Sequence, residues 1–239
     1  MLRDLYLVTG AGGTCSSFVS AFIYHWLADI ATPMSFEWYA SGHNDHEYAW
    51  VKNWNDLDWA APQIFERGSP KDKTLPFVGR QHIPPNTKLL NERFPSHLSF
   101  ITINDISEIE LMGAFLFFKQ EVWAYDYNVN LNWNRYNLPI DKHSPHDLTI
   151  DEVRQCVDAV QRERVSMDSR YSYLGAISSN TIFLEMYDIL CDEDKFLTTI
   201  STALEKPITD CIVQSYNKYI DMNKKLITSK CPWITYFNI

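Results

Sequence analysis

The sequence predicts an α/β fold: one domain built on a parallel sheet of four to five strands with helices on both faces. Apolar runs of strand length alternate along the chain with longer segments whose apolar residues recur at helical spacing. This alternation is typical of a parallel sheet whose crossover connections are helices. The 239 residues, 46% of them hydrophobic, are enough to bury one sizeable core. No repeat or break in composition divides the chain, so we expect a single domain over residues 1–239.

The first elements form a strand, a glycine-rich turn and a helix. The strand is expected over Asp4–Thr9, the turn over Gly10–Ser17 and the apolar helix over Phe18–Ile30, and three of the eight glycines fall within four consecutive positions of the turn. In this arrangement backbone N–H groups and a helix N-terminus point at a shared anion site. The nucleotide-loop pattern G-x-x-x-x-G-K-[ST] would place Gly and Lys where Cys15 and Ser16 stand. The loop therefore predicts a phosphate or sulfate ligand and lacks the usual lysine. 

The remaining elements follow from the same periodicities. Further strands are expected over 75–83, 98–103 and 181–190, and further helices over 106–125, 149–164, 194–204 and 209–226. Thr149 and Glu152 have the T-x-x-E spacing of a capping box, which predicts the start of a helix. The Asn-rich stretch Asp126–His146 is expected to be a surface loop or lid.

Charge and cysteine content exclude several classes of function. A formal net charge of −9 argues against a general binder of nucleic acid or of anionic membranes. The five cysteines are scattered, which supports neither a zinc ribbon nor a disulfide framework and favours a reducing, cytoplasmic compartment. The longest apolar stretch is too short to span a bilayer. The group His43, His46 and Glu47 lacks the H-E-x-x-H order, so no metal site is expected.

Four segments occur in the order known from one enzyme family. They are Gly12–Ser17, then Arg80-Gln81-His82-Ile83-Pro84, then the strand and helix over 100–119, and finally Phe183–Leu190. Together they resemble the sulfotransferases, P-loop-like enzymes that use 3′-phosphoadenosine 5′-phosphosulfate (PAPS). The second segment is similar to the family's Lys-Thr-His-Leu-Pro element, and Asn104 stands 22 residues beyond His82, the family's interval to an arginine that binds the 3′-phosphate. Compact sulfotransferase-like proteins of phages are the most similar in overall character.

The resemblance implies a specific reaction and site. A sulfuryl group would pass from PAPS to a hydroxyl of a small molecule or glycan, with no metal involved. His82 would be the general base, since a histidine near neutral pKa can take the acceptor's proton, and Arg80 would hold sulfate or phosphate oxygens. The donor would be bound by Gly12, Gly13, Thr14, Cys15, Ser16, Ser17 and, at its 3′-phosphate, Asn104.

Departures from the family pattern leave a second interpretation open. Positions that the family fills with a loop cation, an arginine and a serine are here Ala11, Asn104 and Met112. Other basic residues would then have to bind the donor, with Arg135, Arg162 and Arg170 as candidates. The alternative is a non-catalytic protein of sulfotransferase fold with a binding or structural role. It would act as a homo-oligomer or in a viral assembly, located in a phage virion or in the host cytoplasm. A third reading is another phosphoryl-transfer enzyme, with Asp188 as the candidate magnesium ligand.

Overall fold

The computed structural model describes residues 5–10, 15–34, 78–81, 90–92, 94–103, 138, 140, 144, 147–159, 162 and 180–230. In these ranges the strands are β1 (Tyr6–Gly10), β2 (Val78–Gln81), β3 (Leu98–Ile103) and β4 (Thr181–Glu185). The helices are α1 (Ser16–Leu27), α7 (Met186–Cys191), α8 (Glu193–Leu204) and α9 (Asp210–Lys230). Residues 150–159 are also helical.

The four strands form one parallel sheet in the order β2-β1-β3-β4. Tyr6 pairs with Val78 on one side and with Leu98 on the other, and Ser99 pairs with Thr181 across the β3–β4 ladder. The chain therefore crosses β1 between β2 and β3. Parallel strands are joined by such long crossover connections. This confirms the predicted α/β class and the predicted parallel sheet.

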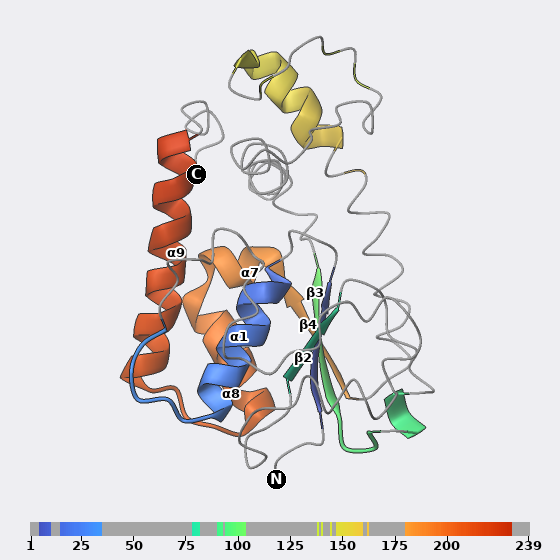
Figure 1. The fold of residues 1–239 in the computed structure, drawn as a ribbon, viewed down its shortest axis with the longest axis vertical. Helices are drawn as coiled ribbons and strands as arrows, with labels where there is room; N and C mark the ends of the chain where they lie inside the picture. Colours follow the sequence, from blue (N-terminus) through green and yellow to red (C-terminus); the bar gives the residue numbers. More distant parts are fainter. Residues whose placement is uncertain are drawn as a thin grey trace.

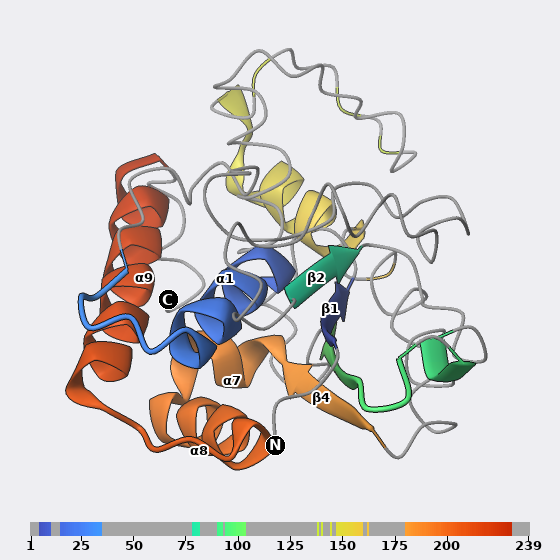
Figure 2. The ribbon, with the colours of Figure 1, turned by 60° about the horizontal axis from the view of Figure 1, so that its bottom comes forward.

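Both faces of the central strands are buried. Tyr6 and Val8 belong to the main hydrophobic cluster, whereas Leu7, between them, is fully buried outside that cluster. Because successive side chains of a strand point to opposite faces, Leu7 lies on the other side of the sheet. Figures 1 and 2 show α1, α7, α8 and α9 on one side of the sheet and the short helical segment 90–92 on the other. Burial on both faces explains why β1 reads as an almost continuous apolar run.

An aromatic cluster packs α1 against α8 and α9. The ring of Phe18 lies 6.0 Å from that of Phe196 on α8 and 3.7 Å from that of Tyr219 on α9, measured between centroids. Phe22 and Phe196 add a further pair at 5.6 Å. Nearly all of α1 is buried, including the polar residues Ser20 and His25, and the helix lies between the sheet and α9 (Figure 1).

Most described elements overlap the predicted ranges, with ends that differ by up to four residues. β3 has the expected limits, and α1 begins two residues earlier and ends three residues earlier than predicted. The predicted capping box is present: the Thr149 N–H donates to Glu152 Oε2 at 2.8 Å, and the Glu152 N–H donates to Thr149 Oγ1 at 3.3 Å. The helix that follows is described to residue 159 and again at 162. The predicted helix over 106–125 and most of the predicted loop over 126–146 lie outside the described residues.

The prediction of one strand over 181–190 is wrong in its second half. β4 ends at Glu185, and Met186–Cys191 forms α7. Met186 and Ile189 are fully buried, and their separation of three residues is helical rather than strand-like. A short apolar run fits either period, and here the packing of α7 beside β4 decides for the helix.

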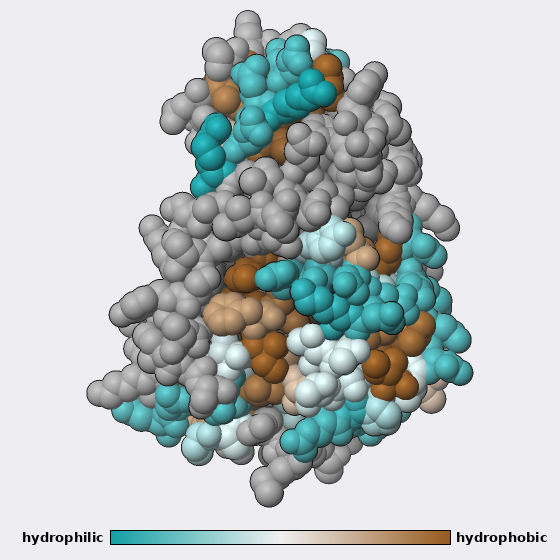
Figure 3. Space-filling view, turned by 180° about the vertical axis from the view of Figure 1, so that it is seen from behind, coloured by the Kyte–Doolittle hydropathy of each residue, from teal (hydrophilic) through white to brown (hydrophobic). Residues whose placement is uncertain are grey.

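In the parts of the chain that the structure describes, no helix is both long and apolar enough to cross a bilayer. Figure 3 shows hydrophobic and hydrophilic patches side by side, and the segment 147–159 at the top of that view is mostly hydrophilic. Its buried positions, Val153, Cys156 and Val157, follow helical spacing, so this helix is amphipathic. Cys15, Cys156, Cys191 and Cys211 form no disulfide bonds with one another in the described part of the chain.

Candidate anion-binding site

The carboxyl ends of the strands meet at one edge of the sheet. Thr9, one residue before the end of β1, pairs with Gln81, the last residue of β2, and Gly10 pairs with Thr102 of β3. The order of the described strands reverses between β1 and β3, and ligands of open α/β sheets bind outside the carboxyl ends at such a switch point. The glycine loop follows β1 at this position in the sheet.

The glycine loop joins α1 at Cys15. This residue precedes the helix with a left-handed backbone, φ 62° and ψ 10°, and its carbonyl accepts the N–H of Val19 at 3.0 Å. A non-glycine residue in this conformation costs about 1–3 kcal/mol, so the turn is held by its surroundings. The Cys15 side chain forms no capping hydrogen bond to α1, and the first turn of the helix carries no acidic residue. The N–H groups of that first turn are therefore compatible with an anionic ligand.

A tyrosine from the far end of the chain lies behind this turn. The Tyr219 hydroxyl donates to Cys15 Sγ at 3.5 Å, and its ring stacks on Phe18 at an interplanar angle of 1°. Tyr219 is 2% exposed. One helical turn away, burial raises the pKa of Tyr216 well above its ordinary value, and the carboxylate of Glu193 adds to the effect. The Tyr216 hydroxyl therefore stays protonated at neutral pH. 

The structure describes some of the predicted site residues and not others. Ser16 is the first residue of α1 and is 2% exposed, and the backbone of Ser17 continues the helix. Arg80 lies in β2 opposite Val8, one residue before the strand ends. The other predicted residues lie outside the described part: Gly12, Gly13, Thr14, His82 and Asn104. His82 directly follows β2 in the sequence and Asn104 directly follows β3.

The end of β4 carries an ion cluster that the sequence analysis did not predict. Lys195 Nζ lies 2.9 Å from Asp188 Oδ2 and 3.8 Å from Glu185 Oε2. Its hydrogen bond to Asp188, together with the charge of that carboxylate, raises the pKa of Lys195 above its ordinary value. Two carboxylates already neutralise this ammonium, so Lys195 is a poor replacement for a missing phosphate-binding cation. Asp188, considered above as a magnesium ligand, is paired with a lysine instead.

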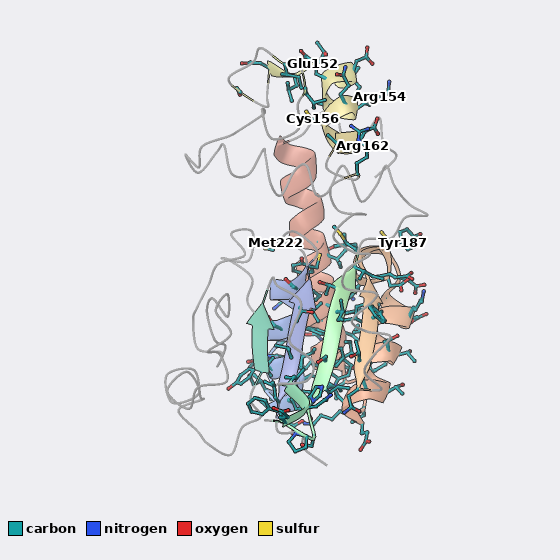
Figure 4. All side chains as sticks on the ribbon, turned by 90° about the vertical axis from the view of Figure 1, so that its right-hand side faces the viewer. Glu152, Arg154, Cys156, Arg162, Tyr187 and Met222 are labelled. Atoms are coloured by element: carbon teal, nitrogen blue, oxygen red, sulfur yellow. The ribbon has the colours of Figure 1, made fainter. Side chains whose placement is uncertain are left out.

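A helical segment lies beyond the carboxyl edge of the sheet. Figures 1 and 4 show residues 150–159 on the side to which the strands point, and in Figure 4 Arg162 lies closer to the sheet than Glu152 or Arg154. Arg162 is exposed, whereas Arg154 Nη1 lies 3.5 Å from the Asp151 carboxylate. In Figure 4, Tyr187 and Met222 lie near the ends of the strands, on the side towards this helical segment.

Metal-binding groups were sought in the same ranges. Among the residues described, no three His, Cys, Asp or Glu side chains gather in a way that would hold a metal ion. The pairs His43 and His46, and His143 and His146, lie outside those ranges.

Comparison with known proteins gives structural matches only. No family model matches the chain, and no curated protein does. Among solved structures, retinol dehydratase in complex with retinol and PAP is 11% identical, with a TM-score of 0.45 over 92% of this chain and 64% of the dehydratase. This chain thus spans less than two thirds of that protein. A sulfotransferase from Mycobacterium tuberculosis H37Rv is 11% identical, with a TM-score of 0.38 over 96% of this chain and 77% of the other. A sulfotransferase from Alicyclobacillus acidocaldarius is 10% identical, with a TM-score of 0.41 over 96% of both chains.

Proposed function

We propose that this protein is a PAPS-dependent sulfotransferase that moves a sulfuryl group to a hydroxyl of a small molecule or glycan. The observation that carries the proposal is the common edge at which β1, β2 and β3 end. The parallel register ends these strands side by side, and each strand ends within one of the sulfotransferase-like segments or just before it. Segments far apart in the sequence are thereby brought to one switch point of the sheet.

In the proposed reaction each segment has one task. The N–H groups of the loop Gly12–Ser17 and the start of α1 hold the 5′-phosphate of the donor. His82 takes the proton of the acceptor hydroxyl as the acceptor oxygen attacks sulfur. The bond between sulfur and the donor's bridging oxygen breaks, and 3′,5′-adenosine bisphosphate (PAP) leaves with the bonding electron pair. Arg80 stabilises the sulfuryl oxygens, whose charge changes during the transfer.

The 3′-phosphate of the donor needs a cation that Asn104 does not supply. We assign this task to Arg162, because it is exposed, forms no ion pair among those found in the described residues, and lies beyond the strand ends (Figure 4). A guanidinium binds phosphate through paired N–H groups, which a lysine ammonium cannot do.

Calorimetric titration with PAPS tests donor binding, with ATP as the matched control for a general nucleotide site. We expect heat with PAPS and PAP and none with ATP. Release of PAP in the presence of phenols, aliphatic alcohols or sugars then tests transfer. His82→Ala should keep PAPS binding and lower the transfer rate by about 10²–10⁴-fold, the usual contribution of a general base. Absence of any PAPS binding at millimolar ligand overturns the proposal.

A non-catalytic protein of the same fold is the second candidate. It is favoured by the three substituted positions, Ala11, Asn104 and Met112, each of which removes a polar or charged group of the family pattern. This candidate predicts no PAPS binding and a stable multi-subunit assembly, which sedimentation analysis of the purified protein would detect.

A further inference from the structure

Two buried hydroxyls of the sheet have no hydrogen-bond partner in the described part of the chain. They are Thr9 Oγ1 on β1, in a residue that is 0% exposed, and Ser99 Oγ on β3, in a residue that is 2% exposed. Buried side-chain oxygens are nearly always hydrogen-bonded, because an unpaired one has lost its contact with water without a replacement. An unpaired hydroxyl at the edge where ligands bind therefore indicates a partner that the ligand supplies.

Both hydroxyls lie on the same face of the sheet. Leu7 lies on the face opposite the main hydrophobic cluster, Ser99 pairs with Leu7, and Thr9 follows Leu7 by two residues. Paired residues of neighbouring strands share a face, and so do residues two apart on one strand. The helices α1, α7, α8 and α9 lie on the other side of the sheet (Figure 1). The two hydroxyls therefore lie on the face away from α1.

The two hydroxyls differ in their position along the strands. Ser99 is the second residue of β3, near its amino end, whereas Thr9 stands one residue before the carboxyl end of β1. Thr9 pairs with Gln81, and His82 directly follows Gln81 in the sequence. Thr102 Oγ1 donates to the carbonyl oxygen of Thr9 at 3.2 Å, which fixes the backbone at this position. Of the two hydroxyls, that of Thr9 belongs to the edge at which ligands of α/β sheets bind.

The position and chemistry of Thr9 fit the acceptor better than the donor. The first turn of α1 is the proposed site of the donor's 5′-phosphate, and the Thr9 side chain lies on the opposite face. A threonine hydroxyl is uncharged and can both donate and accept a hydrogen bond, so a neutral hydroxyl is a suitable partner. The residue after its strand partner is His82, the proposed base for the reacting hydroxyl.

We propose that Thr9 Oγ1 binds the acceptor and that the acceptor is a vicinal diol, such as a catechol or two neighbouring hydroxyls of a sugar. This inference rests on the proposed sulfotransferase function and names the acceptor class. One hydroxyl of the diol gives its proton to His82 and receives the sulfuryl group, and the neighbouring hydroxyl pairs with Thr9. Solvent does not reach Thr9 in this structure, so binding of the acceptor has to uncover it, and the hydrogen bond then favours diols over acceptors with one hydroxyl.

Catechol and phenol form the matched pair of acceptors, with release of PAP from PAPS as the signal. In the wild type we expect the KM for catechol to be about tenfold below that for phenol, the effect of one hydrogen bond. Thr9→Val keeps the β-branched shape and removes the hydroxyl. It should raise the KM for catechol to that for phenol and leave the KM for phenol and the affinity for PAPS unchanged. Thr9→Ser, which keeps a hydroxyl, should retain the preference for catechol.

Urea unfolding separates this role from a structural one, with Ser99→Ala as the matched control. Thr9→Val and Ser99→Ala each remove an unpaired buried hydroxyl, so both should keep or raise the urea midpoint. The KM for catechol should change in Thr9→Val and not in Ser99→Ala. A lower urea midpoint for Thr9→Val would show that its hydroxyl is paired within the protein, and this result overturns the proposal. An equal rise in the catechol KM for both variants overturns it as well.

Failure of the proposed sulfotransferase function has a different signature. If the wild type does not bind PAPS, that function is wrong, and calorimetric titration with catechol and with phenol in the absence of PAPS then tests Thr9 alone. Catechol should bind the wild type and Thr9→Ser about tenfold more tightly than it binds Thr9→Val. The proposal is overturned if the wild type binds catechol and phenol equally, or if it binds catechol no better than Thr9→Val does.

Discussion

The ring of Tyr219 on α9 lies parallel to that of Phe18 on α1, with centroids 3.7 Å apart, while its hydroxyl reaches Cys15 Sγ at 3.5 Å. One side chain thus contacts both the apolar interior of α1 and the residue at which the glycine loop becomes a helix. The C-terminal helix therefore stabilises the turn that the proposed donor site depends on.

Two substitutions separate the ring contact from the hydroxyl contact. Phe18→Ala should lower the free energy of unfolding by about 3–5 kcal/mol, because it leaves a cavity in the aromatic cluster. Tyr219→Phe keeps the ring and should cost at most about 1.5 kcal/mol for one hydrogen bond. Urea unfolding of both variants measures the difference. Equal losses would mean that the hydroxyl, not the stacking, fixes α9 against α1.

Lys206 closes the C-terminal end of α1. Its Nζ donates to the carbonyl oxygens of Trp26 at 3.3 Å and Leu27 at 3.0 Å, and lies 2.6 Å from Asp29 Oδ1. The Asp29 side chain is 81% exposed and that of Lys206 is 22% exposed. A cation at this position donates hydrogen bonds to carbonyl oxygens of the last turn and is stabilised by the negative end of the helix dipole.

Lys206→Met should therefore lower the free energy of unfolding by about 1–2 kcal/mol. Asp29→Asn removes only an exposed ion pair and should cost less than about 1 kcal/mol. Asparagine also tolerates the left-handed backbone of this residue, φ 51°. Thermal or urea unfolding distinguishes the two, and a larger loss for Asp29→Asn would show that the ion pair outweighs the cap.

Local patterns predicted much of this fold from the sequence. Both limits of β3 were predicted correctly because its apolar run is bounded by polar residues. The start of the helix at Thr149 was predictable because its capping contact joins residues only three positions apart, Thr149 and Glu152. The limit appears at Met186, where the apolar run continues but the chain turns into α7. The sequence pattern of residues 181–190 does not show at which residue the strand ends and the helix begins, because tertiary packing determines that boundary.

The candidate site could be predicted only as far as its backbone. Glycine spacing predicts a turn between β1 and α1, and parallel pairing brings the ends of β2 and β3 beside the end of β1. Residues 11–14 of that turn lie outside the described part of the chain. The Tyr219 contact with Cys15 spans 204 positions, and the Lys206 contact with Trp26 spans 180. Such contacts depend on how helices pack, and no local periodicity encodes them.

The stability of the protein should fall as the pH is lowered past the ordinary range of histidine. Burial lowers the pKa of His25 from its ordinary value of 6.5. At a pH between the pKa of His25 in the folded protein and its pKa in the unfolded chain, only the unfolded chain binds the proton. The contribution of His25 to the free energy of unfolding is therefore complete above about pH 6.5 and is lost as the pH falls towards the pKa of the folded state.

Urea unfolding at pH 7.5 and pH 5.5 measures this effect, with His25→Gln as the matched variant. The carboxylates contribute to the change in both proteins, whereas the His25 contribution exists only in the wild type. The loss of free energy of unfolding between the two pH values should therefore be smaller in His25→Gln. Identical losses in both proteins would contradict a buried, neutral His25.

Arg162 provides the sharpest test of how the proposed donor site replaces its missing cation. Arg162→Met should weaken PAPS binding about tenfold, since loss of one charge-assisted hydrogen bond costs about 1.5 kcal/mol. Arg154→Met, on the same helical segment but paired with Asp151, should leave the affinity unchanged. Titration with adenosine 5′-phosphosulfate, which lacks the 3′-phosphate, separates the two ends of the donor: Arg162→Met should bind it as the wild type does. An equal loss for both ligands would place Arg162 at the sulfate end, and no loss for either would remove it from the site.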